Sequence, residues 1–303
     1  KQEKEDNNYF LPIEEDVSPL GDEGIIGDRV IPNSLCVNPM EGHDADLDGG
    51  PSALTFRRYK KYAAGGPGII WVEATAVNSS GKAHPRQLQI NEDSLHGFSE
   101  LVAEIKKNAV NYKGEPQEPL VVLQLTHSGR QSAPNGEPQP LIAKHSEMFD
   151  QSCGISSDYP VLSDAELMRI EDDFVGAAEL AAAAGFDALD LKACHGYLIH
   201  ELLCSYEESS SKYRGDFLNR ISFLLELTQR IASKIPELIL ASRLVLYDNI
   251  PFPDGWGVTK NGGTEPDLAE PVKLIKRLKE AGLELLSVAF GNPYYDPFLE
   301  RPY

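Results

Sequence analysis

Three side chains with complementary chemistry follow one apolar run of the sequence. The run covers Ala188–Leu191, and Lys192, His195 and Tyr197 come directly after it. An ammonium, an imidazole and a phenol this close together can hold an oxygen atom and deliver a proton to a neighbouring carbon. In α/β proteins, ligands lie at the carboxyl ends of the strands. We therefore predict Lys192, His195 and Tyr197 as catalytic residues.

Two polar side chains interrupt other apolar runs and need partners there. Gln124 lies in Leu120–Leu125, and Arg243 lies in Leu238–Leu244. A buried amide needs a donor and an acceptor, and a buried guanidinium needs an acid or a strong acceptor. A flat heteroaromatic ring with an amide-like edge satisfies both, because glutamine pairs with that edge and arginine stabilises negative charge on the ring. Reduced flavin carries such charge.

The elements that must position these residues alternate along the chain. Apolar runs predict strands at Val30–Val37, Ile69–Ala74, Leu120–Leu125, Ala188–Leu191, Leu238–Leu244 and Leu283–Val288. Helical periodicity predicts helices near Ser52–Ala64, Asp93–Asn111, Asp164–Ala184, Phe217–Ile235 and Asp267–Ala281. Ser163 followed by Glu166 predicts a capping box at the start of one helix.

Strand–helix alternation without repeats predicts an α/β fold with a parallel sheet. The strands are apolar throughout, so helices should cover them. Both a barrel and an open doubly wound sheet fit this pattern. No G-x-G-x-x-G or G-x-x-x-x-G-K-[ST] loop follows a strand, which argues against dinucleotide or P-loop binding in an open sheet. Two long structureless loops, Ser128–Leu162 and Gly196–Gly215, are expected beside the polar cluster.

Composition narrows the class of partner. The chain has 28 basic and 47 acidic residues, a net charge of −19, which argues against nucleic acid and anionic membrane surfaces. Its 303 residues contain no apolar run of the roughly 18 residues that span a membrane. Four cysteines without ligand-type spacing favour a reducing cytoplasm and argue against a metal site. The polar first eight residues should be disordered.

At this point the motifs resemble the old yellow enzyme family of NADH:flavin oxidoreductases, near its 2,4-dienoyl-CoA reductase-like branch. The resemblance runs from about Gly27 to the end of the chain. It is carried by the segments NPME, GGPGIIWVEATAV, QLTHSGRQ, GFDALDLKACHGYL and YRGDFLNRISFLLE. It implies a (β/α)8 TIM-barrel domain at 27–303, which binds FMN and follows an N-terminal extension at 1–26.

The resemblance also assigns roles at matching positions. Pro39 and Met40 would lie against the flavin, and Ala74 near its edge. Gln124 would bind the pyrimidine edge, and Arg243 the N1/O2 side. The resemblance further implies that Lys192 and His195 hold the substrate carbonyl oxygen and that Tyr197 donates a proton. The implied activity is NAD(P)H-dependent reduction of an electron-poor C=C bond, with NADH or NADPH as reductant and a small molecule with an activated C=C or carbonyl as substrate.

Three departures from the family pattern stand out. Lys192 replaces a histidine or asparagine, which changes the expected substrate scope. Glu41 replaces a small hydroxyl residue, and its carboxylate would disfavour an anionic reduced flavin unless it is paired or turned away. Only about six of the eight barrel strands are found, and the two that hold the FMN phosphate in the family are not among them. We therefore expect a C-terminally incomplete barrel.

Two other functions fit parts of the pattern. Lys192 at a strand end could form a Schiff base, as in a class I lyase or aldolase. Alternatively, the chain is a non-catalytic or incomplete barrel subunit, because six strands cannot close an eight-stranded barrel. Its partner would be a second copy or a separate chain that completes the barrel. Beside the site, His127 is expected to cap a turn and Arg130 to be a surface charge.

Overall fold

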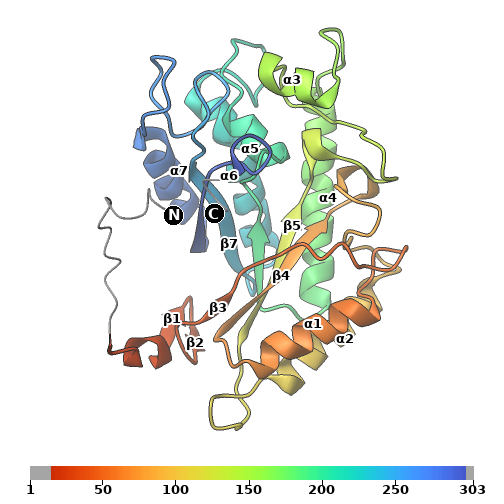
Figure 1. Ribbon diagram of the computed structural model, residues 1–303, viewed down its shortest axis with the longest axis vertical. Helices are drawn as coiled ribbons and strands as arrows, with labels where there is room; N and C mark the ends of the chain where they lie inside the picture. The colour runs from red at the N-terminus through yellow and green to blue at the C-terminus, as the bar shows by residue number, and fades with distance from the viewer. Residues whose placement is uncertain (1–14, 298–303) are drawn as a thin grey trace, which may run out of the picture.

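A computed structural model describes residues 15–297 of the chain. The disorder predicted for the first eight residues lies outside this range. A short 3-10 helix, η1 (Ser18–Gly21), precedes an antiparallel hairpin of β1 (Gly24–Ile26) and β2 (Arg29–Ile31). The rest of the described chain forms one curled sheet with helices packed on its outer side (Figure 1).

The curled sheet has six parallel strands in sequence order. They are β3 (Cys36–Val37), β4 (Ile69–Ala76), β5 (Leu120–Thr126), β6 (Ala188–Leu191), β7 (Ile239–Tyr247) and β8 (Leu283–Phe290). Among the described residues β3 pairs only with β4, and β8 only with β7, so the sheet stays open between them. This is the six-stranded part of a TIM barrel, which confirms the predicted fold class.

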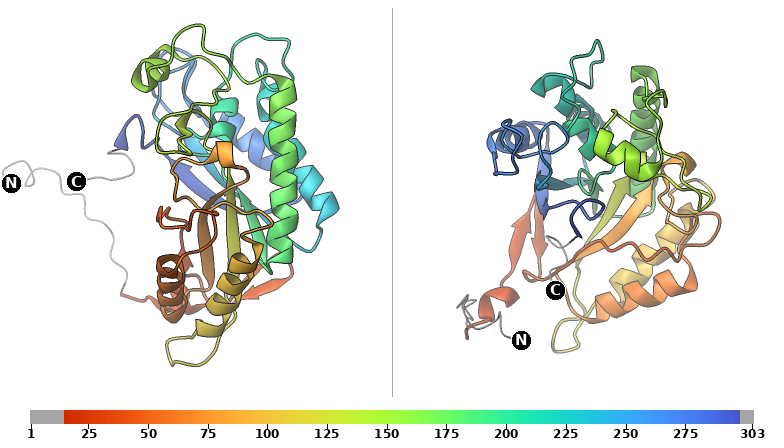
Figure 2. Two further views of the ribbon diagram at one scale, coloured as in Figure 1. Left: turned by 90° about the vertical axis from the view of Figure 1, so that its right-hand side faces the viewer. Right: turned by 45° about the horizontal axis from the view of Figure 1, so that its top comes forward.

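Helices between the strands cover the convex face of the sheet (Figures 1 and 2). The long ones are α1 (Ala53–Ala64), α2 (Leu95–Asn108), α4 (Asp164–Ala183), α6 (Phe217–Lys234) and α7 (Ala269–Glu280). Each lies within two residues of its predicted bounds, apart from the end of α2, which comes three residues earlier than predicted. The capping box of Ser163 and Glu166 starts α4 as predicted. No helix of residues 15–297 combines the length and the hydropathy that crossing a membrane requires.

Two apolar cores lie on opposite faces of the sheet. The larger one packs the helices against the strands. The smaller one fills the concave side near the amino ends of the strands, where Ile31 from the hairpin packs with Trp71, Val122 and Ile239. The hairpin is tied there by Arg29, whose guanidinium lies 2.5 Å from the Asp187 carboxylate just before β6. The hairpin thus seals the end of the sheet away from the predicted site.

The single strand predicted at Val30–Val37 is wrong, because the structure divides it between β2 and β3. Pro32 lacks an N–H group, and the Asn33 side chain accepts hydrogen bonds from the backbone of Leu35 and Gly68. These contacts turn the chain and prevent a continuous ladder.

The two long loops are not structureless, contrary to the prediction. The first contains η3 (Gly129–Gln131) and α3 (Glu147–Cys153), which Ser146 caps at its start. The second contains α5 (Leu198–Leu203), which is buried along its whole length. These helices are too short to show a clear period, so the sequence pattern did not reveal them.

Candidate active site

A cavity of about 600 Å³ opens at the carboxyl ends of the strands. Seven of the eight predicted site residues line it: Pro39, Met40, Gln124, Lys192, His195, Tyr197 and Arg243. Ala74 is not among the lining residues. It is buried, and its carbonyl accepts a hydrogen bond from the Gln87 side chain, which holds the end of β4 against the following loop. The structure therefore does not support the predicted contact of Ala74 with a ligand in this cavity.

A buried aspartate that the sequence analysis missed fixes the Gln124 amide. Asp190 Oδ2 accepts a hydrogen bond from Gln124 Nε2 at 2.5 Å and another from the Trp71 indole at 2.9 Å. Its Oδ1 accepts from the backbone N–H of Arg243 at 2.6 Å. Burial raises the pKa of Asp190 to about 6, against the opposing effect of these donors. With Nε2 held by the carboxylate, Gln124 keeps its carbonyl oxygen and a second amide hydrogen for a ligand.

Arg243 reaches the cavity with most of its guanidinium unused. Within the described part of the chain, the Arg243 side chain makes one hydrogen bond, which its Nη1 donates to the Pro39 carbonyl oxygen at 3.3 Å. Its Nε is buried and has no partner within residues 15–297. A buried N–H group without a partner costs about 1–3 kcal/mol. The position therefore suits a ligand that brings hydrogen-bond acceptors to Arg243 beside Gln124.

The Glu41 carboxylate gathers three other side chains at the cavity. Its Oε1 lies 2.7 Å from Lys192 Nζ, and both of its oxygens accept from the Tyr197 hydroxyl, at 3.2 and 3.3 Å. His43 Nε2 lies 3.1 Å from Oε2. Burial acts to raise the pKa of Glu41, but the Lys192 charge and the two hydrogen bonds outweigh it and hold the pKa at about 2. Glu41 is therefore ionised and paired, which removes the conflict with a reduced flavin expected from the sequence.

The loop that carries Glu41 is held in place by a second carboxylate. Glu73 in β4 accepts a hydrogen bond from the Gly42 backbone at 2.5 Å and another from the Arg58 guanidinium. Arg58 also binds Asp44 at 2.5 Å, two residues beyond Gly42. Because α1, β4 and this loop share the network, Glu41 is directed toward Lys192 by buried ionic contacts.

Tyr197 and His195 leave β6 through a strained turn. His195 has a φ of +62° and Gly196 a φ of +70°, and left-handed backbone at a non-glycine residue is uncommon. Burial lowers the pKa of His195 to about 2, and the nearby Lys192 charge acts in the same direction, so this imidazole is neutral. Burial also raises the pKa of Tyr197 well above its ordinary value, and the Glu41 charge adds to the effect.

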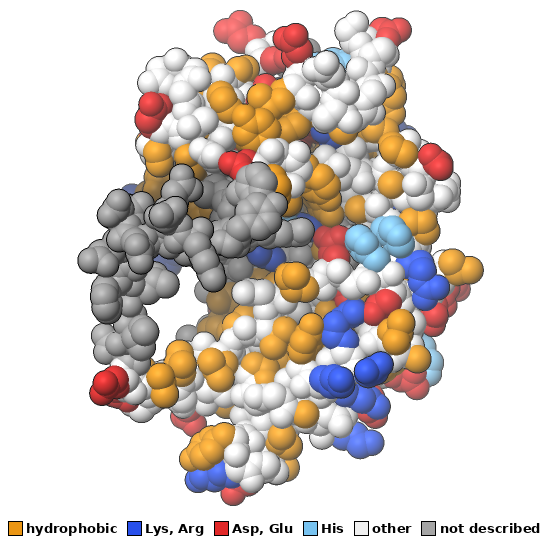
Figure 3. Space-filling model, in the orientation of Figure 1, with side chains coloured by type: hydrophobic (Ala, Val, Ile, Leu, Met, Phe, Trp, Pro, Cys, Tyr) orange, Lys and Arg blue, Asp and Glu red, His pale blue; other side chains and the backbone are white. Residues whose placement is uncertain are grey.

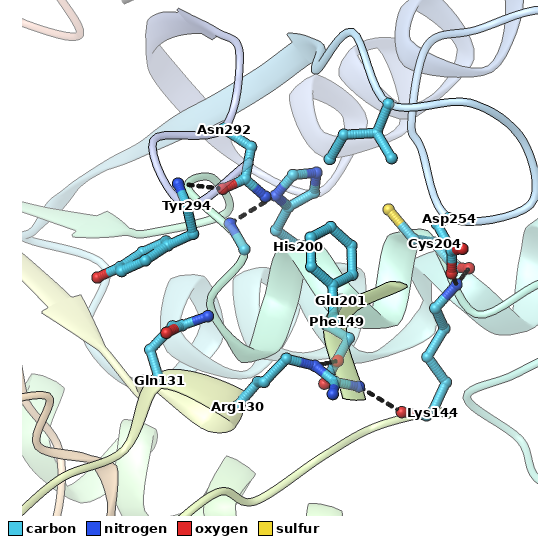
Figure 4. A pocket seen from close by; sticks show the side chains of 12 residues that line it. Arg130, Gln131, Lys144, Phe149, His200, Glu201, Cys204, Asp254, Asn292 and Tyr294 are labelled. Carbon is cyan, nitrogen blue, oxygen red and sulfur yellow. Dashed lines mark hydrogen bonds and ion pairs between the residues drawn. The ribbon is translucent and has the colours of Figure 1, made fainter. Parts of the chain in front are cut away.

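His200 in α5 braces this turn from behind. Its Nδ1 accepts a hydrogen bond from the Gly196 backbone at 2.8 Å (Figure 4). Its Nε2 lies 3.1 Å from Asp248 Oδ2. A neutral imidazole that accepts at Nδ1 must carry its proton at Nε2, so Nε2 donates to Asp248. Cys204 lies close enough to His200 and Asp248 to form a metal-ligand group. However, the protonated Nε2 offers no lone pair, so we interpret the group as a hydrogen-bonded brace.

His127 and Arg130 lie in the loop that follows β5. His127 accepts a hydrogen bond from the Gly129 backbone at 3.2 Å, which confirms its turn-capping role. The surface position predicted for Arg130 is wrong, because its guanidinium is buried and binds Asp150 at 2.5 Å and Glu201 at 2.6 Å. These carboxylates lie in later helices, so local sequence gave no sign of the pairing.

The wall of the cavity opposite Gln124 comes from β8 and the segment after it. Val288 and Phe290 line the cavity and are 44% and 52% exposed, so this wall is open to solvent. The Tyr294 ring lies 6.4 Å from that of Tyr197, centroid to centroid. No periodic element follows β8, so the sequence pattern alone does not place Tyr294 at the cavity.

Comparison with known proteins agrees with this geometry. The NADH:flavin oxidoreductase / NADH oxidase family profile matches residues 25–284. A NADH:flavin oxidoreductase of Gibberella zeae is 27% identical over 86% of this chain and 64% of its own length. A NADH oxidase of Thermoanaerobacter brockii is 32% identical over 93% of this chain and 41% of its own length. The chain thus spans less than two thirds of both relatives.

A similar fold is found among solved structures. The old yellow enzyme homologue of Zymomonas mobilis superposes with a TM-score of 0.70 at 23% identity. The match covers 90% of this chain and 74% of the homologue. At this level of identity the likeness establishes the fold alone.

Proposed function

The chain belongs to the NADH:flavin oxidoreductase / NADH oxidase family, and from this premise we propose that it is an FMN-dependent ene-reductase. It would use NADH or NADPH to reduce an electron-poor C=C bond of a small molecule. The bound flavin would supply hydride transfer to the β-carbon of that bond. The remaining chemistry falls to side chains of the chain itself.

The observation that carries this proposal is the unpartnered Nε of Arg243 beside the fixed amide of Gln124. Both side chains line one cavity, and both need what the edge of an isoalloxazine ring offers. Arg243 would bind the N1/O2 side, and Gln124 the pyrimidine edge. Pro39 and Met40, also at the cavity, would lie against the ring.

The other lining residues supply the proton and the oxygen site. Tyr197 would protonate the α-carbon of the substrate. Lys192 and the neutral His195 would donate hydrogen bonds to the carbonyl oxygen, where negative charge develops during reduction. The pairing of Lys192 with Glu41 leaves further ammonium hydrogens for that oxygen, because a lysine carries three.

The six strands of the described sheet would contact only part of an FMN molecule. Residues 15–297 provide the ring-edge contacts, but no strands corresponding to the last two of a barrel. We propose that the phosphate end of FMN is bound by a segment outside the described residues or by a partner chain.

The division of the chain into an N-terminal extension at 1–26 and a barrel domain at 27–303 stays a prediction. A cytoplasmic location is proposed because all four cysteines are free.

The Schiff-base alternative is less well supported by the geometry. A lysine must be neutral to attack a carbonyl, whereas Lys192 Nζ donates to an ionised carboxylate at 2.7 Å. That alternative also gives Gln124 and Arg243 no role. Borohydride trapping with a carbonyl substrate would label Lys192 if the alternative were correct, and we expect no adduct.

The proposed function is tested by separating the two half-reactions. We expect the chain to bind FMN, to be bleached by NADH or NADPH, and to be reoxidised by an activated enone. Tyr197→Phe should leave the bleaching rate unchanged and slow reoxidation by about 100-fold or more, since it removes the proton donor. A chain that takes up no flavin from excess FMN would overturn the proposal.

A further inference from the structure

A continuous line of hydrogen-bonding groups joins Tyr197 to the protein surface. The Tyr197 hydroxyl lies 3.2 and 3.3 Å from the Glu41 oxygens, and Glu41 Oε2 lies 3.1 Å from His43 Nε2. Tyr197 itself is 3% exposed, whereas the side chains of Glu41 and His43 are 18% and 39% exposed. Exposure therefore increases at each step from the phenol to the imidazole.

We propose that Glu41 and His43 form a relay that returns a solvent proton to Tyr197 after each turnover. This inference rests on the proposed role of Tyr197 as proton donor. The family resemblance does not supply it, because Glu41 replaces a small hydroxyl residue. Neither Glu41 nor His43 is thereby a catalytic residue, since each acts through Tyr197.

The proton balance of the relay is simple. When Tyr197 has given its proton to the substrate carbon, it is left as a phenolate. The Nε2–H bond of protonated His43 breaks as a proton moves to Glu41 Oε2, and the new O–H bond breaks as a proton moves to the phenolate. His43 is left neutral and takes a proton from water. The net change is the transfer of one solvent proton to Tyr197.

Lys192 does not offer an equivalent route from solvent. Its Nζ lies 3.7 Å from the centre of the Tyr197 ring and is paired with Glu41, but the side chain is 3% exposed. Its ammonium donates to Glu41 Oε1 at 2.7 Å. Lys192 therefore stabilises the carboxylate without connecting it to water.

His43 is placed to hold a proton more strongly than an ordinary histidine. Its hydrogen bond with Glu41 raises its pKa, burial acts in the opposite direction, and the charges of Glu41 and Glu73 raise the pKa while Lys192 lowers it. The His84 ring stacks on His43 with centroids 4.5 Å apart. Figure 3 shows histidine side chains at the surface of this face beside acidic and basic ones.

A first test needs no flavin. In the full-length chain, the His43 imidazole should titrate by NMR above the ordinary histidine value, and Glu41→Gln should lower its midpoint. The Tyr197 ring signals should follow the His43 titration in the wild type and cease to follow it in Glu41→Gln. An identical His43 midpoint in both proteins would overturn the relay.

A second test uses the FMN-loaded chain. His43→Gln keeps a donor toward Glu41 but cannot exchange protons near neutral pH, so it should slow steady-state turnover about tenfold. Added imidazole should restore the rate. The wild-type rate should fall as pH rises through the His43 midpoint, and this dependence should vanish in His43→Gln. His96→Gln is the matched control, because His96 is an exposed histidine of α2.

The two tests separate this inference from the function on which it rests. If the wild-type chain does not turn over, the proposed function fails, and the NMR titration alone decides whether the relay exists. If the wild type turns over and His43→Gln matches it without imidazole, the relay is wrong while the proposed function stands.

Discussion

The middle of the curled sheet and its two open sides are built differently. Strands β4 to β7 pair continuously, and every residue of β5 and β6 is buried. In β8, by contrast, several residues are exposed or half-buried, and β3 is only two residues long. The buried polar groups Asp190, Gln124 and Glu73 all lie in the middle strands.

This difference shows which part of the site each region can supply. The middle strands position individual polar atoms: Asp190 is fixed by donors from β4, β5 and β7, and Glu73 by donors from α1 and from the loop after β3. The open side at β8 supplies a wall, formed by exposed apolar residues such as Val288 and Phe290. Under the proposed function, the described residues would supply the contacts to a ring edge, whereas they leave the ligand open to solvent on the β8 side.

The largest contrast between the two regions should appear in stability. Asp190→Leu leaves the N–H groups of Gln124, Trp71 and Arg243 without their acceptor, so we expect a loss of about 3 kcal/mol or more in unfolding free energy. Val288→Ser on the open side should change the unfolding free energy by less than about 0.5 kcal/mol. Urea unfolding measures both. Equal effects of the two substitutions would remove the contrast.

A smaller change in unfolding free energy should come from replacing Glu41, which links the loop after β3 to the residues after β6. Its pKa is lowered from 4.5 to about 2 in the folded protein. The stabilisation is therefore fully present above pH 4.5 and is lost as the pH falls toward 2. The wild type should exceed Glu41→Gln by about 2–3 kcal/mol at pH 6, and the difference should shrink below pH 4.5. Urea unfolding of both proteins between about pH 2 and pH 6 measures this difference. A difference that does not change with pH would contradict the prediction.

The smallest expected effect concerns the flavin phosphate. Under the proposed function the described residues would contact the flavin ring and not its phosphate. FMN and riboflavin should therefore bind with dissociation constants within about threefold of each other, a difference below about 0.7 kcal/mol. Quenching of flavin fluorescence measures both constants. A preference of 100-fold or more for FMN would mean that this chain holds the phosphate itself.

Much of the fold could be predicted from the sequence. Five of the six apolar runs became strands of the sheet in the predicted order, and the family resemblance of NPME and QLTHSGRQ was confirmed by the family match. The prediction of one strand at Val30–Val37 failed because it joined two short apolar runs across Pro32 and Asn33, which break the ladder. Short helices such as α3 and α5 were missed because one or two turns carry no clear period.

Two signals in the sequence pointed to residues of the cavity: polar side chains directly after an apolar strand, such as Lys192, and polar side chains within one. Gln124 and Arg243 were found as polar residues in apolar strands. Asp190 in ALDL carries the same signal and was overlooked. The contact of Glu41 with Lys192 gave no sign in the sequence, because the two residues are 151 positions apart and meet only when the sheet curls.

The central claim is that Gln124 and Arg243 bind the edge of a flavin ring in this cavity. The most direct measurement is the dissociation constant for FMN of the wild type, Arg243→Met and Gln124→Leu, with Arg57→Met at an exposed site of α1 as control. We predict that Arg243→Met and Gln124→Leu each weaken binding about tenfold or more, since each loses hydrogen bonds to the ring, and that the control is unchanged. Equal affinity in all four proteins would contradict the account.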